Sequence, residues 1–222
     1  MNAEEFLHMN ELSKTAVLLL SGLALLLSSG AGMAGYKARG WSANAREFYT
    51  ASLTSEGVTI AADPFYTDAQ AARVFDKKDI VTRGIMPVAI IIFNDNDYPI
   101  EIDGLSVELI RGDEHYPSLS PFDAVNRLFG KSKSPLTGSA SRVENVEALK
   151  DFEDKFLREL SVPPHEKAGG FAFFRIYNPK DLQDYLSTAT VYIPNIYRGD
   201  DGSPLIFFEI ELKPVLKRAK QN

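Results

Sequence analysis

The hydrophobic pattern divides the chain into one uninterrupted apolar run near the N-terminus and a longer region of short apolar runs. Residues 15–35 read TAVLLLSGLALLLSSGAGMAG and hold no charged side chain. A helix of this length spans about 30 Å, which matches the hydrocarbon core of a bilayer. The strongly apolar part, Ala16 to Leu27, is shorter and is followed by small residues. An uncleaved membrane helix, a cleaved signal peptide and a helix docked inside a membrane complex all fit this pattern.

The residues around the apolar run favour a retained helix. Three glutamates and one lysine precede it, whereas signal peptides usually begin with positive charge. A lipobox-like SSG motif is followed by Ala31, so this site offers no thiol for lipid attachment. In a retained helix, small residues form a face that permits close packing against a second helix. These predicted helix-packing residues are Ser28, Gly30, Gly32 and Ala34.

Residues 36–56 are expected to form a juxtamembrane connector. Aromatic and basic residues at its start suit a membrane interface, namely Tyr36, Lys37, Arg39 and Trp41. Packing of Trp41 against the following domain is the competing interpretation. The positive-inside rule, taken alone, would keep the domain in the cytoplasm. The domain's composition is instead typical of an envelope module, so we favour the extracytoplasmic, periplasmic side.

From residue 57 onward the pattern indicates strands. The β-branched run at 86–93 predicts a central buried strand. The polar stretch NDNDYP then predicts a turn, and alternation within 105–110 predicts a half-exposed strand. In the last strand, Phe208, Ile210 and Leu212 are expected on one face and Phe207, Glu209 and Glu211 on the other. The further strand candidates are 57–61, 169–177, 188–197 and 205–215, with turns at Asp63-Pro64 and Gly169-Gly170.

Helices are expected in the connections between strands. Residues 67–75 predict a short helix with Thr67 or Asp68 as its N-cap. Residues 120–129 begin with a serine cap and a proline at the first helical position. After a polar loop, apolar residues recur at intervals of three and four and predict an amphipathic helix at 144–160. The two longer helices form an insert at 120–160.

Short strands with helices only in the connections predict a mainly β fold, an antiparallel sandwich. The segments IIIFNDNDYPIEIDGLSVELI and SVPPHEKAGGFAFFRI resemble the immunoglobulin-like domains of uncharacterised bacterial envelope proteins and lipoproteins. The resemblance covers residues 57–110 and 160–215 and implies a fold and a location more than an activity. The expected organisation is a membrane or signal segment at 1–35, the connector at 36–56, the sandwich at 57–215 and a basic tail at 216–222.

The composition of the chain excludes several kinds of binding and catalytic site. The net charge of −6 provides no cationic field for nucleic acid, and the chain has no cysteine for disulfides, thiolate chemistry or cysteine metal sites. The three histidines, His8, His115 and His165, lie outside any hydrolase or zinc motif. An Asn/Asp turn and a second acidic turn could together hold calcium, although such residues are also ordinary turn formers. The candidate calcium ligands are Asp95, Asp97, Asp200 and Asp201.

These observations predict no catalytic residue, no cofactor and no evident small-molecule substrate. We expect a membrane-tethered, non-catalytic β-sandwich that acts as an interaction module, scaffold or accessory subunit of a bacterial envelope or membrane complex. Its partners would be the lipid bilayer and other membrane or envelope subunits. The alternative is an exported, cleaved ligand-binding module that uses loops such as 94–98 and 197–203, and an enzyme is a distant third.

Overall fold

The computed structural model describes residues 35–103, 106–130 and 145–218. The chain divides into two compact units, Met1–Gly35 and Tyr36–Asn222, and the second holds every element described below. The apolar run up to Ala34, with its predicted helix-packing face, lies outside the described residues. Among the residues that are described, no helix is long and apolar enough to cross a membrane.

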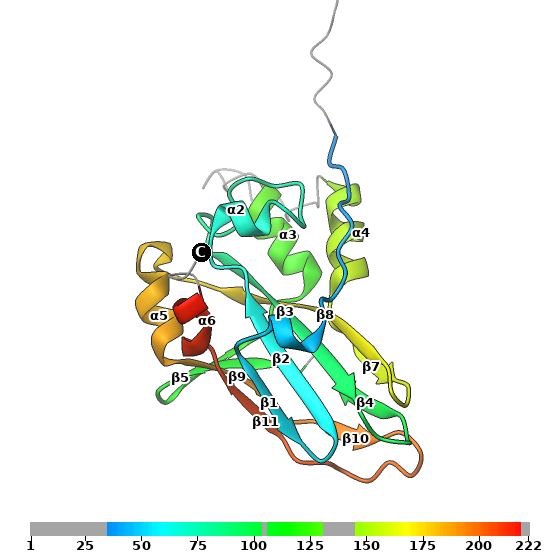
Figure 1. Ribbon diagram of the computed structural model, residues 1–222. Helices are drawn as coiled ribbons and strands as arrows, with labels where there is room; N and C mark the ends of the chain where they lie inside the picture. The colour runs from blue at the N-terminus through cyan, green and yellow to red at the C-terminus, as the bar shows by residue number, and fades with distance from the viewer. Residues whose placement is uncertain (1–34, 104–105, 131–144, 219–222) are drawn as a thin grey trace, which may run out of the picture. The chain divides into compact units, whose positions relative to one another are not determined.

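The second unit is mainly β, and its strands pair in antiparallel fashion (Figure 1). The strands are β1 (Ser52–Ser55), β2 (Val58–Pro64), β3 (Ile85–Asn94), β4 (Ile100–Asp103), β5 (Glu108–Arg111), β6 (Glu114–Pro117), β7 (Glu159–Val162), β8 (Lys167–Arg175), β9 (Ala189–Ile193), β10 (Ile196–Arg198) and β11 (Phe208–Glu211). They form two four-stranded sheets, β1-β2-β3-β8 and β11-β9-β5-β6, and a three-stranded sheet, β10-β4-β7. The predicted mainly β, antiparallel class is therefore confirmed.

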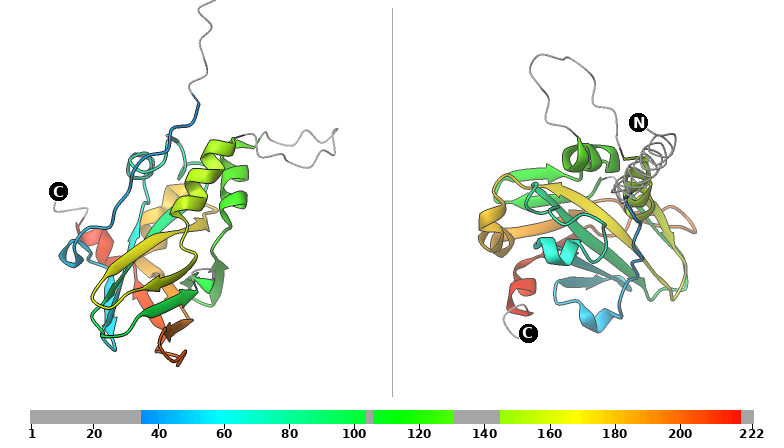
Figure 2. Two further views of the ribbon diagram at one scale, coloured as in Figure 1. Left: turned by 90° about the vertical axis from the view of Figure 1, so that its right-hand side faces the viewer. Right: turned by 90° about the horizontal axis from the view of Figure 1, so that it is seen from above.

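The two four-stranded sheets meet along both edges, because β11 contacts β1 and β2 while β6 contacts β8. The helices join the strands, and α3 contacts α4 above the strand ends (Figure 2). The helical elements are η1 (Arg46–Phe48), α2 (Asp68–Ala71), α3 (Pro121–Phe129), α4 (Val146–Lys155), η3 (Pro179–Asp181), α5 (Leu182–Thr188) and α6 (Lys213–Arg218).

Strand β3 is the centre of the first sheet, with β2 and β8 as its neighbours. Every residue from Ile85 to Asn94 is buried, as the β-branched run predicts. The buried aromatic rings of β8 pack against helix and loop residues above the sheet. Phe75 lies 4.5 Å from Phe152 and 5.2 Å from Phe171 between ring centroids. These rings join the sheet to α4 and form the upper part of the core.

The first hairpin differs from its predicted boundaries. Residues 52–55, expected in the connector, form β1 and pair with β2. The turn lies at Glu56 and Gly57, where both φ angles are positive, +49° and +73°. A two-residue turn with both central φ angles positive matches the right-handed twist of a hairpin. Asp63-Pro64, predicted as a turn, instead ends β2 and pairs with Ala89 and Val88 of β3.

The helix predicted at 144–160 is shorter in the structure. Helix α4 ends at Lys155, and Phe156 adopts an extended conformation. The Leu157 N–H then donates to the Phe171 carbonyl of β8, and β7 follows as an edge strand that pairs with β4. The heptad-like spacing of apolar residues predicted one helix. The unpaired edge of β4 and the aromatic core at β8 favour an extended segment instead, so tertiary pairing overrides local propensity.

Other predictions hold at finer detail. Thr67 caps α2 in a reciprocal capping box with Gln70, and the Ser120 side chain caps α3. Helix α2 is nevertheless only four residues long, not the nine predicted. Phe208, Ile210 and Leu212 are buried while Phe207 is 49% exposed, as the alternation predicts. Strand β6 and helices α5 and α6 were not predicted, and α6 includes part of the expected basic tail.

Gly170 lies within β8 and not in the predicted turn, and it permits a close backbone approach. A Cβ built there would lie 2.9 Å from the Leu157 Cα and backbone N. Gly170→Ala is therefore expected to lower the free energy of unfolding by about 1–3 kcal/mol, the usual cost of overpacking. Denaturant unfolding measures this, with Gly40→Ala as control because nothing lies within 4 Å of a Cβ at Gly40. Equal losses in both variants would contradict the prediction.

Candidate functional site

The start of the connector is fixed to the domain by a buried carboxylate. The Tyr36 hydroxyl donates to Oδ2 of Asp151 at 2.6 Å and accepts the Asp76 backbone N–H at 3.2 Å. Asp151 lies on α4, is 4% exposed and also forms an ion pair with Lys155. Because a buried carboxylate must be paired, both partners are needed to stabilise Asp151 in the core. We call the contact surface of Tyr36, Asp76, Asp151 and Lys155 the connector seat.

Asp76 binds the next residues of the connector. Its carboxylate accepts the Lys37 backbone N–H at 3.0 Å and the Arg39 guanidinium at 2.7 Å. Arg39 also donates to the Ala72 carbonyl. The Lys37 N–H and then the Arg39 side chain hold the pKa of Asp76 below its usual range. The carboxylate is therefore ionised at neutral pH and holds the connector by charge-assisted hydrogen bonds.

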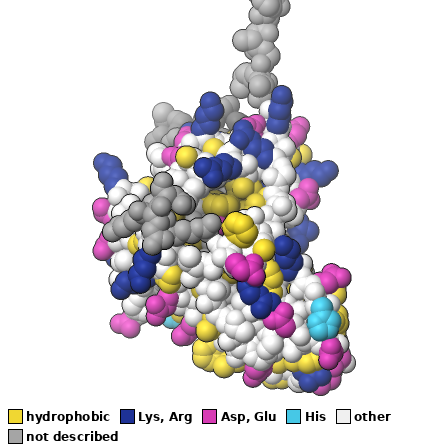
Figure 3. All heavy atoms as spheres, in the orientation of Figure 1, with side chains coloured by type: hydrophobic (Ala, Val, Ile, Leu, Met, Phe, Trp, Pro, Cys, Tyr) yellow, Lys and Arg dark blue, Asp and Glu magenta, His cyan; other side chains and the backbone are white. Residues whose placement is uncertain are grey.

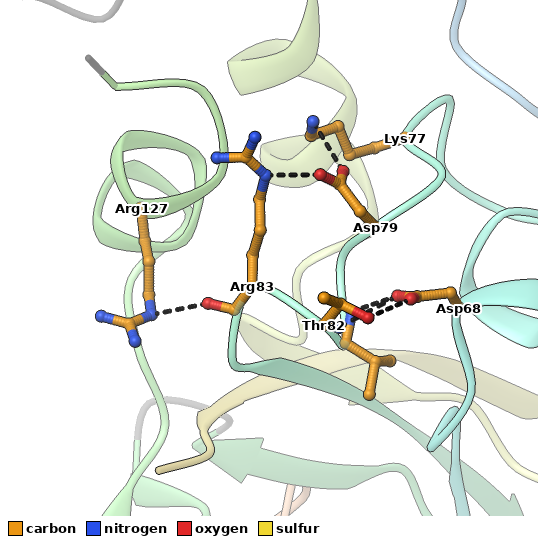
Figure 4. A network of polar contacts seen from close by, with 7 residues as sticks. Asp68, Lys77, Asp79, Thr82, Arg83 and Arg127 are labelled. Carbon is orange, nitrogen blue, oxygen red and sulfur yellow. Dashed lines mark hydrogen bonds and ion pairs between the residues drawn. The ribbon is translucent and has the colours of Figure 1, made fainter. Parts of the chain in front are cut away.

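A polar network holds the loop that carries Asp76 (Figure 4). Asp68, in α2, accepts the Val81 N–H at 2.7 Å and the Thr82 hydroxyl at 2.5 Å. Farther along the loop, Asp79 pairs with both Lys77 and Arg83 at 2.6 Å. These bonds hold the loop between α2 and β3, which carries Asp76, in a defined conformation. The Arg127 side chain of α3 adds a bond to the Arg83 carbonyl at 3.1 Å.

The rest of the connector runs along the first sheet. The Trp41 ring packs edge-on against Phe171 of β8, with ring centroids 4.8 Å apart. Lys167 donates to the carbonyls of Ala43 and Asn44 at 2.9 and 3.0 Å. Arg46 then forms an ion pair with Asp95 at 2.6 Å, in the turn after β3. The connector is thus attached at its start, middle and end.

A hollow of about 360 Å³ lies between the connector and the sheet. Trp41 and Tyr66 line one part of it, while Gln70 and Arg73 supply polar groups. Figure 3 shows hydrophobic side chains gathered in the middle of this face, with Lys and Arg side chains above them. The hollow is a consequence of the connector lying over the sheet.

The predicted membrane-interface residues all lie at or near the connector seat. Tyr36 and Trp41 are half-buried against the domain, so the packing interpretation describes their present contacts. Lys37 and Arg39 are exposed. The contact of this group with a membrane stays a prediction.

Each of the predicted calcium ligands contacts a basic side chain. Asp95 pairs with Arg46, and Asp97 lies 2.9 Å from Nε2 of His165. Asp200 and Asp201 both pair with Arg198. The Arg198 guanidinium also lies 3.9 Å from the centroid of the Tyr98 ring, so it contacts the turn that holds Asp95 and Asp97. In the described parts of the chain, no three His, Asp or Glu side chains come close enough to hold a metal ion. The calcium hypothesis stays a prediction.

A pocket that the sequence did not predict lies beside β6, an edge strand of the second four-stranded sheet. It has a volume of about 360 Å³ and is lined by three tyrosines from separate elements: Tyr116 from β6, Tyr177 from the loop after β8, and Tyr185 from α5. Polar side chains complete the lining. We call it the tyrosine pocket, and its full lining is Arg111, Tyr116, Tyr177, Asn178, Asp181, Asp184 and Tyr185.

Removing the Tyr36 hydroxyl tests whether its hydrogen bond to Asp151 stabilises the domain. Tyr36→Phe removes one of the two partners of buried Asp151, and a hydrogen bond to a charged group contributes about 1.5–3 kcal/mol. We expect the free energy of unfolding to fall by about that amount in denaturant titrations at pH 7. Tyr197→Phe, on β10, is the matched control and should change little. Equal stability of wild type and Tyr36→Phe would contradict this role.

The connector seat also predicts alkaline sensitivity. Burial and the bond to Asp151 raise the pKa of Tyr36 above its usual value near 10. A pKa raised in the folded state gives stability that is present below the unfolded pKa and lost as pH rises above it. Wild type should therefore lose more stability than Tyr36→Phe between about pH 9.5 and 11.5 in denaturant titrations. Equal losses of stability in the two proteins would contradict the prediction. Burial also raises the pKa of Tyr185, to about 12, but Tyr185 is present in both proteins and affects them alike.

No family model matches the sequence, and no curated protein matches it. The chain is similar to the solved structure of the YjhA protein from Bacillus subtilis, with 10% identity, a TM-score of 0.35, and coverage of 64% of this chain and 77% of that one. It is also similar to a "putative lipoprotein", YcdA, from the same species, with 10% identity, a TM-score of 0.35 and coverage of 78% of this chain. The match spans 42% of the YcdA chain, less than half its length.

Proposed function

We propose that this protein is a membrane-tethered, non-catalytic interaction module, an accessory or scaffold subunit of a bacterial envelope or membrane complex. In this proposal, the apolar run at 15–35 is a retained transmembrane helix and the β domain is an immunoglobulin-like sandwich on the extracytoplasmic side. The partners are the bilayer and other membrane or envelope subunits. No catalytic step or cofactor is part of the proposal.

The observation that carries the proposal is the connector seat. Tyr36 follows the apolar run directly in the sequence, and Tyr36, Lys37 and Arg39 are all bonded to the domain. A flexible linker would let a tethered domain move freely around its anchor. A connector bonded along its length instead leaves no free linker between residue 36 and the strands, which suits a subunit that must present one surface to a fixed neighbour.

The second candidate is an exported module that binds a ligand after cleavage near Ala34. The tyrosine pocket favours it, because a concave site lined by aromatic rings and a few polar groups is the usual form of a small-ligand site. The two candidates differ in whether the N-terminal segment is retained. They can be separated by the mass of the protein isolated from cells.

We expect the full-length protein to stay with membranes after an alkaline carbonate wash and to keep the mass of residues 1–222. A double variant, Leu20→Arg with Leu26→Arg, should release it, because an arginine at the centre of a spanning helix costs about 2.5–3.5 kcal/mol. Leu53→Arg, at a 40% exposed position on β1, is the control and should stay with the membrane.

Two results would contradict the tethered-subunit proposal. An isolated protein that lacks residues 1–34 would favour the cleaved module. A full-length protein that always runs as a single chain after gentle solubilisation, by native mass spectrometry, would remove the scaffold role while leaving the anchor in place.

A further inference from the structure

The tyrosine pocket has an aromatic surface held open to solvent. Its central ring, Tyr116, lies 6.5 Å from Tyr177 and 6.5 Å from Tyr185 between centroids, with interplanar angles of 50° in both pairs. Tyr177 is 70% exposed, and the Arg175 guanidinium lies over its ring at 4.6 Å. A large aromatic side chain that is fixed but not buried provides a contact surface for a ligand at little entropic cost.

Polar groups at the edge of these rings are held in place by neighbouring side chains. Arg111 donates from Nε to the Thr188 hydroxyl at 3.1 Å and from Nη2 to Asp184 at 3.2 Å. Its guanidinium also lies over the Tyr185 ring at 5.1 Å. These contacts use two of the five N–H donors of a guanidinium, so Arg111 is positioned and retains donor capacity.

The tyrosine pocket also contains two carboxylates and a buried hydroxyl group. The carboxylate of Asp184 has a 75% exposed side chain, and Asp181 accepts a hydrogen bond from Asn178. The Tyr185 hydroxyl is buried and has no hydrogen-bond partner among the described residues. Burial raises the pKa of Tyr185 to about 12, so its hydroxyl keeps its proton at neutral pH. A buried polar group without a partner is rare in proteins and is one of the features found at functional sites.

The charges around the pocket are of both signs. Arg111 and Arg175 would attract an anion, while Glu114, Asp181 and Asp184 would repel it. The reverse holds for a cation, and Arg111 already lies over the Tyr185 ring where a cation would otherwise bind. A neutral ligand with many donors and acceptors avoids both conflicts.

We propose that the tyrosine pocket binds a neutral saccharide chain, with the Tyr116 and Tyr177 rings against the sugar's C–H face and Arg111, Asp181 and Asp184 hydrogen-bonded to its hydroxyls. Sugar hydroxyls both donate and accept hydrogen bonds, as serine hydroxyls do, so one ring can satisfy guanidinium and carboxylate groups together. The C–H faces of the sugar ring supply the apolar surface that aromatic side chains contact. This binding site would serve either the tethered module or the cleaved one.

Saturation-transfer NMR with the full-length protein in detergent tests the proposal. The probes are cellohexaose, maltohexaose and chitohexaose at up to millimolar concentrations, with inorganic phosphate and tetramethylammonium as charged probes. We expect at least one hexasaccharide to bind and neither charged probe to compete. Tyr177→Ala should weaken that binding about tenfold or more, consistent with the loss of one aromatic contact.

Tyr197→Ala is the matched control, because Tyr197 is also exposed but lies on β10, in the three-stranded sheet. It should leave saccharide binding unchanged, and Asp184→Asn should weaken it without unfolding the domain. Three results would overturn the proposal: no hexasaccharide binds, phosphate or tetramethylammonium displaces the sugar from the pocket, or Tyr177→Ala binds as tightly as wild type.

Discussion

The burial of Asp151 is the constraint on which the arrangement of the N-terminal part of the domain depends. A carboxylate that is 4% exposed on the core-facing side of α4 would be strongly destabilising alone, so it requires Tyr36 and Lys155 as partners. The requirement fixes Tyr36 against α4, and the Tyr36 hydroxyl in turn binds the Asp76 backbone. Asp76 then holds the next turn of the connector. One buried charge thereby joins three segments that are far apart in the sequence, and makes the connector part of the domain.

Much of the fold could be predicted where local and tertiary preferences agree. The run at 86–93 is β-branched and wholly apolar, and it forms the central strand. Ser120 has the sequence of a helix cap and is one. The prediction failed at 156–162, where helical spacing of apolar residues competes with the free edge of β4 and with aromatic packing at β8. Strand pairing is non-local, so the local sequence pattern does not show that partners in β4 and β8 will favour an extended conformation here.

The candidate sites were less predictable, for different physical reasons. Tyr36 and Trp41 stand out in the sequence as interface residues, but Asp151 and Phe171, which they contact, lie more than a hundred residues farther along the chain. The connector seat had no clear local signal, because Asp151 comes one residue before Phe152 and therefore lies about 100° around the helix from that apolar position, among the charged residues. The tyrosine pocket also lacked a local signal. Its rings come from three elements, and two of those, β6 and α5, were not predicted.

The central claim is that the connector is a fixed part of the domain and not a flexible tether. The chain has no cysteine, so two spin labels can be placed without removing native residues. Ala38→Cys in the connector and Glu147→Cys on α4 are exposed positions for such labels. Pulsed electron paramagnetic resonance on the full-length protein in lipid nanodiscs measures the distribution of distances between them. We predict one narrow distribution that broadens in Tyr36→Phe, and a broad distribution in the wild-type protein would contradict the account.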